Sequence, residues 1–325
     1  MNKHKRPRRL RRTDAIRRMV RETQLSPAHF IYPIFVTRSN PGAIHGMPDV
    51  YRYTIDEAVQ VARKVEQAGI SGILLFGIPQ SKDETATQAV SSTGIIPDTI
   101  QAIKRANLNL VIITDVCICS YTSHGHCGIL QDQVVSNDPT LPVIAEMAKV
   151  HADSGADIVA PSGMMDHQVH AIREQLDCSG HEHVSILSYS VKYASAFYGP
   201  FRDAAGGAPQ FGDRKTHQMD CSNAQEALRE VDMDIEEGAD LIMIKPALSY
   251  LDIIRLIKDQ RPHLSLVAYN VSGEYAMIKA ASAQGWMDES TAVLEVLTSI
   301  RRAGAQSVIS YHALDAANWL QELST

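Results

Sequence analysis

The sequence predicts an α/β protein of the TIM (β/α)8 barrel class with an extended N-terminal arm. Eight short apolar runs alternate with amphipathic segments, many of which end at a glycine. The runs are continuously apolar, which is typical of parallel strands covered on both faces. No Gly-rich phosphate loop follows the first run, and this counts against the alternative, a doubly wound open sheet. We expect residues 1–25 to form the arm and residues 26–325 a single barrel domain.

The predicted elements follow one another as strand and helix units. A first strand at 30–36 precedes a helix at 55–67, whose apolar residues recur at helical spacing and which ends before Gly69. The other apolar runs predict strands at 72–77, 110–115, 157–162, 185–192, 240–245, 264–271 and 307–311. The amphipathic segments predict helices at 97–107, 142–154, 168–176, 224–237, 250–259, from about 273, and at 290–303.

The composition is that of an ordinary globular protein, with 45% hydrophobic and 21% charged residues. We expect no membrane span, because no run of about 18 apolar residues is present. The charged N-terminus has no apolar stretch behind it, so it does not resemble a secretory signal. Five cysteines, three of them crowded together, favour a metal or catalytic site in a reducing compartment over disulfides. The expected location is therefore the cytoplasm.

The predicted arm is strongly basic, although the whole chain has a net charge of −6. Residues 1–21 hold ten of the 31 lysines and arginines but one acid, Asp14. Such an arm can bind nucleic acid, phosphate or a membrane surface, or it can lie on an acidic surface of its own or a neighbouring subunit. The lack of interleaved aromatic residues favours the subunit surface.

Two lysines end predicted strands, Lys192 the fifth and Lys245 the sixth. In a TIM barrel the working residues lie at the carboxyl ends of strands, and neighbouring strands are about 4.8 Å apart. Two protonated amines at such a short distance repel each other, so the pKa of at least one of them falls. Its free amine can then attack a carbonyl. We therefore predict that both lysines form Schiff bases. The alternative is that each pairs with a carboxylate of the barrel.

A cysteine array follows the third predicted strand, in the segment Asp115-Val-Cys-Ile-Cys-Ser-Tyr-Thr-Ser-His-Gly-His-Cys127. Three thiols in a flexible loop suit a soft cation such as zinc, and three protein ligands leave a position open, as in catalytic sites. His124 or His126 is an alternative fourth ligand, which would make the site structural. Three free thiols without a metal are the other alternative.

About 30 residues, 193–222, separate Lys192 from the next helix and are too many for a simple connection. The segment contains four glycines, the aromatic residues Tyr198, Phe201 and Phe211, and the basic residues Arg202, Arg214 and Lys215. A Gly-hinged basic loop over a barrel mouth is typical of a lid that binds a carboxylate or phosphate. A mobile surface loop is the alternative. Hydroxyls at the same rim come from Ser272 and Tyr311.

With these residues assembled, the sequence resembles the porphobilinogen synthase (5-aminolevulinate dehydratase) family over nearly its whole length. The resemblance runs from the basic segment at Arg6 to Ser310-Tyr-His. Its specific motifs are the cysteine array, the lysine block Tyr-Ser-Val-Lys-Tyr-Ala-Ser, Met-Ile-Lys-Pro, the lid motif Phe-Tyr-Gly-Pro-Phe-Arg-Asp-Ala, and Tyr-Asn-Val-Ser-Gly-Glu-Tyr. The sequence departs from the pattern at Gly163, where many members have Asp, at His167-Gln168, where they have Gly-Arg, and at Cys221, where Pro is usual.

The resemblance implies a lyase that condenses two 5-aminolevulinate molecules to porphobilinogen, with loss of two waters, in tetrapyrrole and heme biosynthesis. Lys245 would form the Schiff base on the propionate side and Lys192 on the acetate side. Zinc would be held by Cys117, Cys119 and Cys127. The remaining implied substrate contacts are Asp115 and Ser162 at the acetate-side amino group, Arg202, Arg214 and Gln218 at its carboxylate, Ser272 and Tyr311 at the other carboxylate, and the lid residues Tyr198 and Phe201.

The resemblance also implies a second metal and an assembly. The acidic segment 229–240 is similar to that of members with an activating, allosteric magnesium site, with Glu230 as the ligand. Its alternative is a solvated acidic helix face. Members of the family use the N-terminal arm to embrace a neighbouring barrel in dimers that form homo-octamers, which supports an oligomerisation role for residues 1–25.

Two other function classes make different predictions. A single-lysine Schiff-base aldolase that happens to bind zinc would modify one lysine when reduced with borohydride in the presence of substrate. A nucleic-acid binder would lose a salt-sensitive affinity for RNA or DNA when residues 1–21 are removed.

Overall fold

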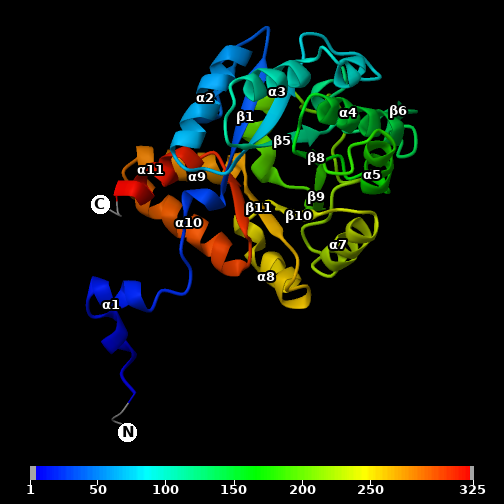
Figure 1. Ribbon diagram of the computed structural model, residues 1–325. Helices are drawn as coiled ribbons and strands as arrows, with labels where there is room; N and C mark the ends of the chain where they lie inside the picture. The colour runs from blue at the N-terminus through cyan, green and yellow to red at the C-terminus, as the bar shows by residue number, and fades with distance from the viewer. Residues whose placement is uncertain (1–4, 323–325) are drawn as a thin grey trace.

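The computed structural model describes residues 5–322, and its centre is a closed barrel of eight parallel strands (Figure 1). The barrel closes where the last strand pairs with the first, with Phe30 opposite Val308. The predicted TIM-barrel class is therefore confirmed. The barrel strands are β1 (Phe30–Thr37), β4 (Gly72–Ile78), β5 (Val111–Val116), β8 (Ile158–Pro161), β9 (Ser185–Lys192), β10 (Leu241–Lys245), β11 (Leu266–Asn270) and β12 (Ser307–Ser310).

Helices pack around the outside of the barrel, as the alternation of apolar and amphipathic segments predicted. In α2 the Thr54 hydroxyl accepts a hydrogen bond from the Glu57 backbone N–H, while the Glu57 carboxylate accepts one from the Thr54 N–H, and this capping box fixes the start of the helix. The outer helices are α2 (Ile55–Gln67), α3 (Ile95–Arg105), α4 (Leu141–Asp153), α5 (Gln168–Cys178), α7 (Glu226–Glu236), α8 (Leu251–Gln260), α9 (Ser272–Ala283), α10 (Glu289–Ala303) and α11 (Ala313–Glu322).

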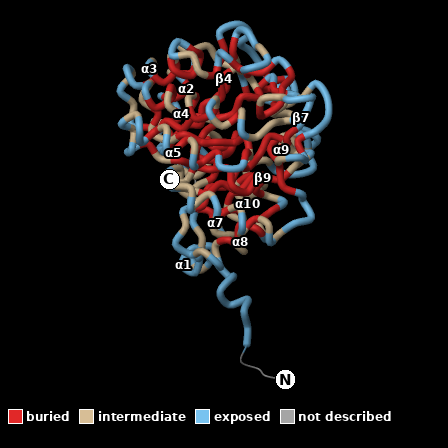
Figure 2. Tube along the Cα trace, turned by 90° about the vertical axis from the view of Figure 1, so that its right-hand side faces the viewer, coloured by how far each residue is buried: buried red, intermediate tan, exposed pale blue. Residues whose placement is uncertain are grey.

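The apolar core has two main layers, which explains the continuous apolar runs. In β1, Phe35 belongs to the cluster inside the barrel, whereas its neighbours Ile34 and Val36 belong to the cluster between barrel and helices. Both sides of each strand are therefore buried, and the trace of the barrel is almost continuously buried (Figure 2). Among residues 5–322, no helix is long and apolar enough to cross a membrane.

Several elements were not predicted. After β1 the chain forms a hairpin of β2 (Gly42–Ile44) and β3 (Met47–Tyr53), and β3 extends the sheet beside β1. A small hairpin of β6 (Leu130–Gln131) and β7 (Val134–Val135) follows the cysteine segment. The predicted lid contains a short helix, α6 (Gly199–Ala205), and α11 follows β12.

The N-terminal segment extends away from the barrel (Figure 1). It contains a 3-10 helix at Pro7–Arg11 and the short helix α1 (Asp14–Met19), and neither contains a buried residue. The apolar side chains of Leu10, Met19 and Val20 are exposed, Met19 to 76%. Residues 1–4 of the predicted arm and residues 323–325 of the predicted domain lie outside the described residues.

Candidate functional site

Lys192 and Lys245 lie side by side at the carboxyl end of the barrel, as the strand count predicted. They are the last residues of β9 and β10 and are direct partners in the register of these two parallel strands. Both side chains are 5% exposed. Their amines approach the same ring, with Lys192 Nζ 5.4 Å and Lys245 Nζ 5.1 Å from the centroid of Tyr189. The two amines therefore share one buried space.

The amine of Lys245 is surrounded by aromatic rings. Besides Tyr189, its Nζ lies 5.2 Å from the ring centroid of Tyr198, 4.8 Å from Phe201 and 4.5 Å from Tyr269. Burial, and then the positive charge of Lys192, lower the pKa of Lys245 to about 7. This shift favours the uncharged amine, which is the form that attacks a carbonyl.

Asp115 and Ser162 lie next to the lysine pair. Burial raises the pKa of Asp115 to about 6, although the charges of Lys192 and Lys245 oppose this shift. The Asp115 side chain also hydrogen-bonds the side chain of Ser162. Lys192 Nζ donates a hydrogen bond to the backbone carbonyl of Ser162. A carboxyl group that titrates near pH 6 beside two amines can both accept and donate protons.

Cys117, Cys119 and Cys127 form a buried cluster above these residues. Their sulfur atoms all lie within 4.8 Å of one another, and none is in a disulfide. Three buried thiols at this spacing are the donor set that zinc prefers, so the residues fit the implied metal. His124 and His126 are buried but do not belong to this group of donor atoms, which favours a site with three protein ligands.

The lid lies directly on the barrel mouth and the cysteine segment. Phe201 packs on Phe76, with ring centroids 5.1 Å apart, and closes the space above Lys245. A Cβ at Gly207 would come within 3.3 Å of Cys119 Sγ, so the lid backbone and this thiol are in close contact. The Gln210 N–H donates to the His124 carbonyl at 3.1 Å. The lid and the cysteine segment therefore form one wall.

Of the basic lid residues, Arg214 is buried and Arg202 is half-buried, whereas Lys215 is exposed. Arg214 is 6% exposed, and its guanidinium donates to the carbonyls of Gly125 and Gly207. Its Nε has no hydrogen-bond partner among the described residues, and neither have Arg202 Nε and both polar side-chain atoms of Gln218. Buried polar groups are seldom left unpaired. These three side chains therefore offer donors for an anion.

A second polar pair lies on the opposite rim of the mouth. The Tyr311 hydroxyl is 3.0 Å from the hydroxyl of Tyr269, beside the rings around Lys245. The Ser272 hydroxyl accepts a hydrogen bond from the Phe201 N–H at 3.0 Å and donates to the Phe197 carbonyl at 3.3 Å. In this arrangement the Ser272 hydroxyl ties the start of α9 to the lid.

Three residues of the site were not predicted from the sequence: Tyr189, Tyr269 and Glu274. Tyr189 and Tyr269 lie within strands that are buried on both faces, so burial does not separate barrel-facing residues from the others. Glu274 is fully buried and accepts hydrogen bonds from the Leu248 N–H and the Asn270 side chain. Its position two residues after Ser272, in the first turn of a helix, was the signal that could have identified it.

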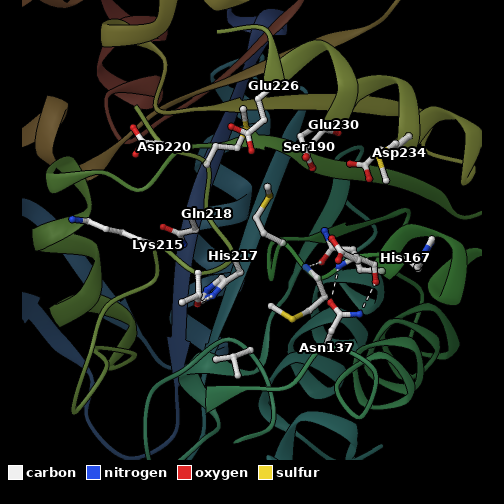
Figure 3. Close-up of a pocket in the computed structure, with 18 of the residues that line it drawn as sticks. Asn137, His167, Ser190, Lys215, His217, Gln218, Asp220, Glu226, Glu230 and Asp234 are labelled. Carbon is white, nitrogen blue, oxygen red and sulfur yellow. Dashed lines mark hydrogen bonds between the residues drawn. The ribbon is translucent and has the colours of Figure 1, made fainter. Parts of the chain in front are cut away.

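Glu230 lies on α7 outside the barrel, and the cavity that it lines also has Gln218 of the predicted lid in its wall. Glu230 lines this cavity of about 430 Å³ together with Glu226 and Asp234 of the same helix (Figure 3). Burial, and then Asp234 and Glu226, raise the pKa of Glu230 to about 7. Asp234 accepts a hydrogen bond from Ser188 at 2.6 Å. Glu230 belongs to neither of the two sets of metal-donor atoms that come within 4.8 Å among the described residues.

Comparisons with known proteins identify relatives along the whole chain. The sequence profile of the family described as delta-aminolevulinic acid dehydratase matches residues 4–319. The delta-aminolevulinic acid dehydratase of Synechocystis sp. is 53% identical, with 98% of each chain covered. That of Bacillus subtilis is 52% identical, with 99% of this chain and 98% of that protein covered.

A solved structure has the same architecture. It is the delta-aminolevulinic acid dehydratase (porphobilinogen synthase) of Toxoplasma gondii ME49, in complex with the reaction product porphobilinogen. It superposes with a TM-score of 0.95 at 42% sequence identity and covers 98% of this chain and 92% of its own.

Proposed function

The chain belongs to the delta-aminolevulinic acid dehydratase family, and on this premise we propose that it is a lyase that makes porphobilinogen from two molecules of 5-aminolevulinate. Two waters are lost in the reaction, which is a step of tetrapyrrole and heme biosynthesis. The observation that carries the proposal is the register pairing of Lys192 with Lys245 in one buried space. Two ketone substrates call for two imine-forming amines.

The lysines supply the covalent chemistry. The uncharged amine of Lys245 attacks the ketone carbon of one substrate, a C–N bond forms, and the ketone oxygen leaves as water to give an imine. Lys192 does the same with the second substrate. We assign Lys245 to the propionate side and Lys192 to the acetate side. Both amines are released again when the pyrrole forms.

The neighbouring polar groups orient the two substrates. Asp115, with Ser162, faces the acetate-side amino group and transfers protons there, which the pKa of about 6 supports. Arg202, Arg214 and Gln218 bind the carboxylate of that substrate, and their unpaired polar atoms support this assignment. Ser272 and Tyr311 bind the other carboxylate. Tyr198 and Phe201 close the lid and exclude water.

We assign Cys117, Cys119 and Cys127 as ligands of a catalytic zinc ion. The close approach of the three sulfurs supports this assignment. When bound, zinc would supply Lewis-acid assistance to proton transfers at the adjacent substrate. Thiols that hold a metal must stay reduced, which supports a cytoplasmic location.

We further assign Glu230 as a ligand of an activating magnesium ion. Magnesium keeps several of its waters and is held by one or two carboxylates, so it does not require a tight group of donor atoms. The cavity lined by Glu226, Glu230 and Asp234 supports such a hydrated ion. Because this site is outside the barrel, the ion would act as an allosteric activator.

Residues 1–25 are proposed as an oligomerisation arm and residues 26–325 as the catalytic domain. The arm has exposed apolar side chains in addition to its positive charge, and Met19 is 76% exposed. Such a surface suits an acidic and apolar partner surface, for which a second copy of the chain is the best candidate. We propose a homo-octamer, and no nucleic-acid or membrane partner.

The direct test is formation of porphobilinogen from 5-aminolevulinate by the purified chain. Lys245→Ala should reduce turnover by about a thousandfold or more and Lys192→Ala nearly as much. Lys64→Ala, which removes an exposed lysine of α2, is the matched control. A chelator should stop the reaction until zinc is added back. Substantial porphobilinogen formation by the Lys245→Ala variant would refute the proposed mechanism.

A further inference from the structure

A second cluster of metal-binding side chains lies away from the barrel mouth, where α9, α10, α11 and the end of β12 meet. Glu289 begins α10, His312 follows β12, and Asp315 is in the first turn of α11. One donor atom of each residue lies within 4.8 Å of the others. Among residues 5–322, the three cysteines are the other set of three that meets this distance. None of the three residues takes part in the proposed reaction.

The His312 ring packs on Tyr275, with the ring centroids 4.3 Å apart, but its two nitrogens are left without a hydrogen-bond partner among the described residues. His312 is 0% exposed. Its Nδ1 faces Glu289, 3.9 Å from Oε1. Burial lowers the pKa of His312 to about 3, so the ring is neutral and keeps a free lone pair. A buried imidazole of this kind next to carboxylates is a ready metal ligand.

The cluster also has an excess of negative charge. Asp49, Glu289 and Asp315 contribute three carboxyl groups. The facing cation is Lys279, whose Nζ is 2.8 Å from Glu289 and 2.9 Å from Asp49. One ammonium therefore does not balance the cluster, and a divalent cation would.

We propose that Glu289, His312 and Asp315 form a second metal site, which binds a divalent transition-metal cation. One imidazole and two carboxylates suit zinc, manganese, iron, cobalt or nickel, whereas calcium and magnesium prefer oxygen ligands alone. A cavity of about 440 Å³ lined by Lys279 and Glu289 gives the ion a route from solvent. As the ion binds, Lys279 leaves Glu289 and stays paired with Asp49 at the rim.

The site would fasten three elements together. Through Glu289 and Asp315 the ion would connect the starts of α10 and α11 to His312, which lies just after β12. Because the ion binds the folded chain, it should raise the melting temperature in a concentration-dependent way.

Binding of Co²⁺ to the full-length protein tests the proposal. After dialysis against Co²⁺, Glu289→Gln and Asp315→Asn should each bind one ion per chain fewer than the wild type. The sulfur-to-cobalt charge-transfer absorption of the cysteine site should remain unchanged in both variants. Glu295→Gln, an exposed acid of the same helix, is the matched control and should bind as the wild type does.

A substitution at Lys279 allows a second measurement in which all three proposed metal ligands stay in place. Lys279→Gln removes a competing positive charge and should tighten Co²⁺ binding at this site by about fivefold or more. His312→Gln should lose the ion, and circular dichroism checks that it folds. Equal Co²⁺ content in the wild type and Glu289→Gln, or Co²⁺ affinity unchanged by Lys279→Gln, would overturn the assignment.

Discussion

Lys245 shows how strongly the surroundings decide what one side chain can do. In water the amine of a lysine stays protonated up to a pH well above neutral. Here four aromatic rings within about 5 Å remove most of the solvent, and Lys192 adds a positive charge. Asp115 provides partial compensation. The balance leaves the amine uncharged in part at pH 7, which suits a nucleophile.

The pH dependence of turnover follows from this balance. In the proposed mechanism Lys245 reacts as the free amine, so protonation below its pKa of about 7 removes the reactive form. We expect kcat/KM for 5-aminolevulinate to fall about tenfold per pH unit below that value and to level off above it. The zinc content, measured at every pH, is the control, because protonated thiols release metal. A flat profile between about pH 5.5 and pH 7.5 at constant zinc content would contradict this account.

The individual residues differ in how well the sequence predicts them. Lys192 and Lys245 stand out because an amine at the end of an apolar strand is unusual, and the cysteines because of their spacing. Tyr189 carries no such signal. Its neighbours in β9 are buried on both sides, so its orientation toward the amines depends on the closure of the barrel.

The strands are the elements that the sequence predicts best. The predicted range of β9 agrees with the structure at both ends, and that of β10 differs by one residue at its start. These strands are short and almost fully buried, although β9 also contains three serines, and polar or turn residues bound them. Because the predicted and observed strands end at the same residues, both lysines were predicted correctly as the last residues of their strands.

The missed elements have identifiable causes. The hairpin of β2 and β3 contains Pro48 and exposed polar residues, so it does not show the pattern of a buried strand. Helix α6 starts with Gly199-Pro200, which is also typical of a loop. Helix α11 was predictable, since Ala313, Ala316 and Ala317 recur at helical spacing and are buried.

Glu274 ties the loop after β10 to the start of α9, and we expect its replacement to loosen this connection. One carboxylate oxygen accepts from the Leu248 N–H at 2.8 Å, and the other accepts from Asn270 and the Val271 N–H. In Glu274→Gln an NH2 group replaces one carboxylate oxygen and faces at least one of these N–H groups, from which it cannot accept a hydrogen bond. The substitution should therefore lower the free energy of unfolding by about 1–3 kcal/mol. Urea unfolding at equal chain concentration measures the difference.

A control separates this effect from a general loss of charge. Glu295→Gln changes an exposed position of α10 and should alter the free energy of unfolding by less than about 0.5 kcal/mol. Equal stability of Glu274→Gln and the wild type would show that the buried carboxylate does not fasten the loop after Lys245.

At the scale of the whole molecule, the arm and the barrel differ in how much of the chain they bury. The described arm is basic and has no buried residue in its two helical segments, while the barrel has a dense apolar core. A single chain thus leaves Leu10 and Met19 in solvent. This arrangement is explained if another chain covers the arm.

Removal of residues 1–25 should therefore convert the assembly into smaller species. Sedimentation velocity at several chain concentrations measures the size distribution, and circular dichroism verifies that the barrel remains folded. If the truncated chain keeps the full-length size but loses a salt-sensitive affinity for RNA or DNA, the arm serves nucleic-acid binding instead.

The central claim is that two adjacent lysines each bind one molecule of the same substrate. Reduction with borohydride in the presence of 5-aminolevulinate, followed by mass-spectrometric mapping of the lysines and a zinc count on the same sample, tests it most directly. We predict substrate-derived mass on Lys245 and on Lys192, with every other lysine unmodified. Labelling of a single one of the two, as in a one-lysine aldolase, or of neither, would contradict it.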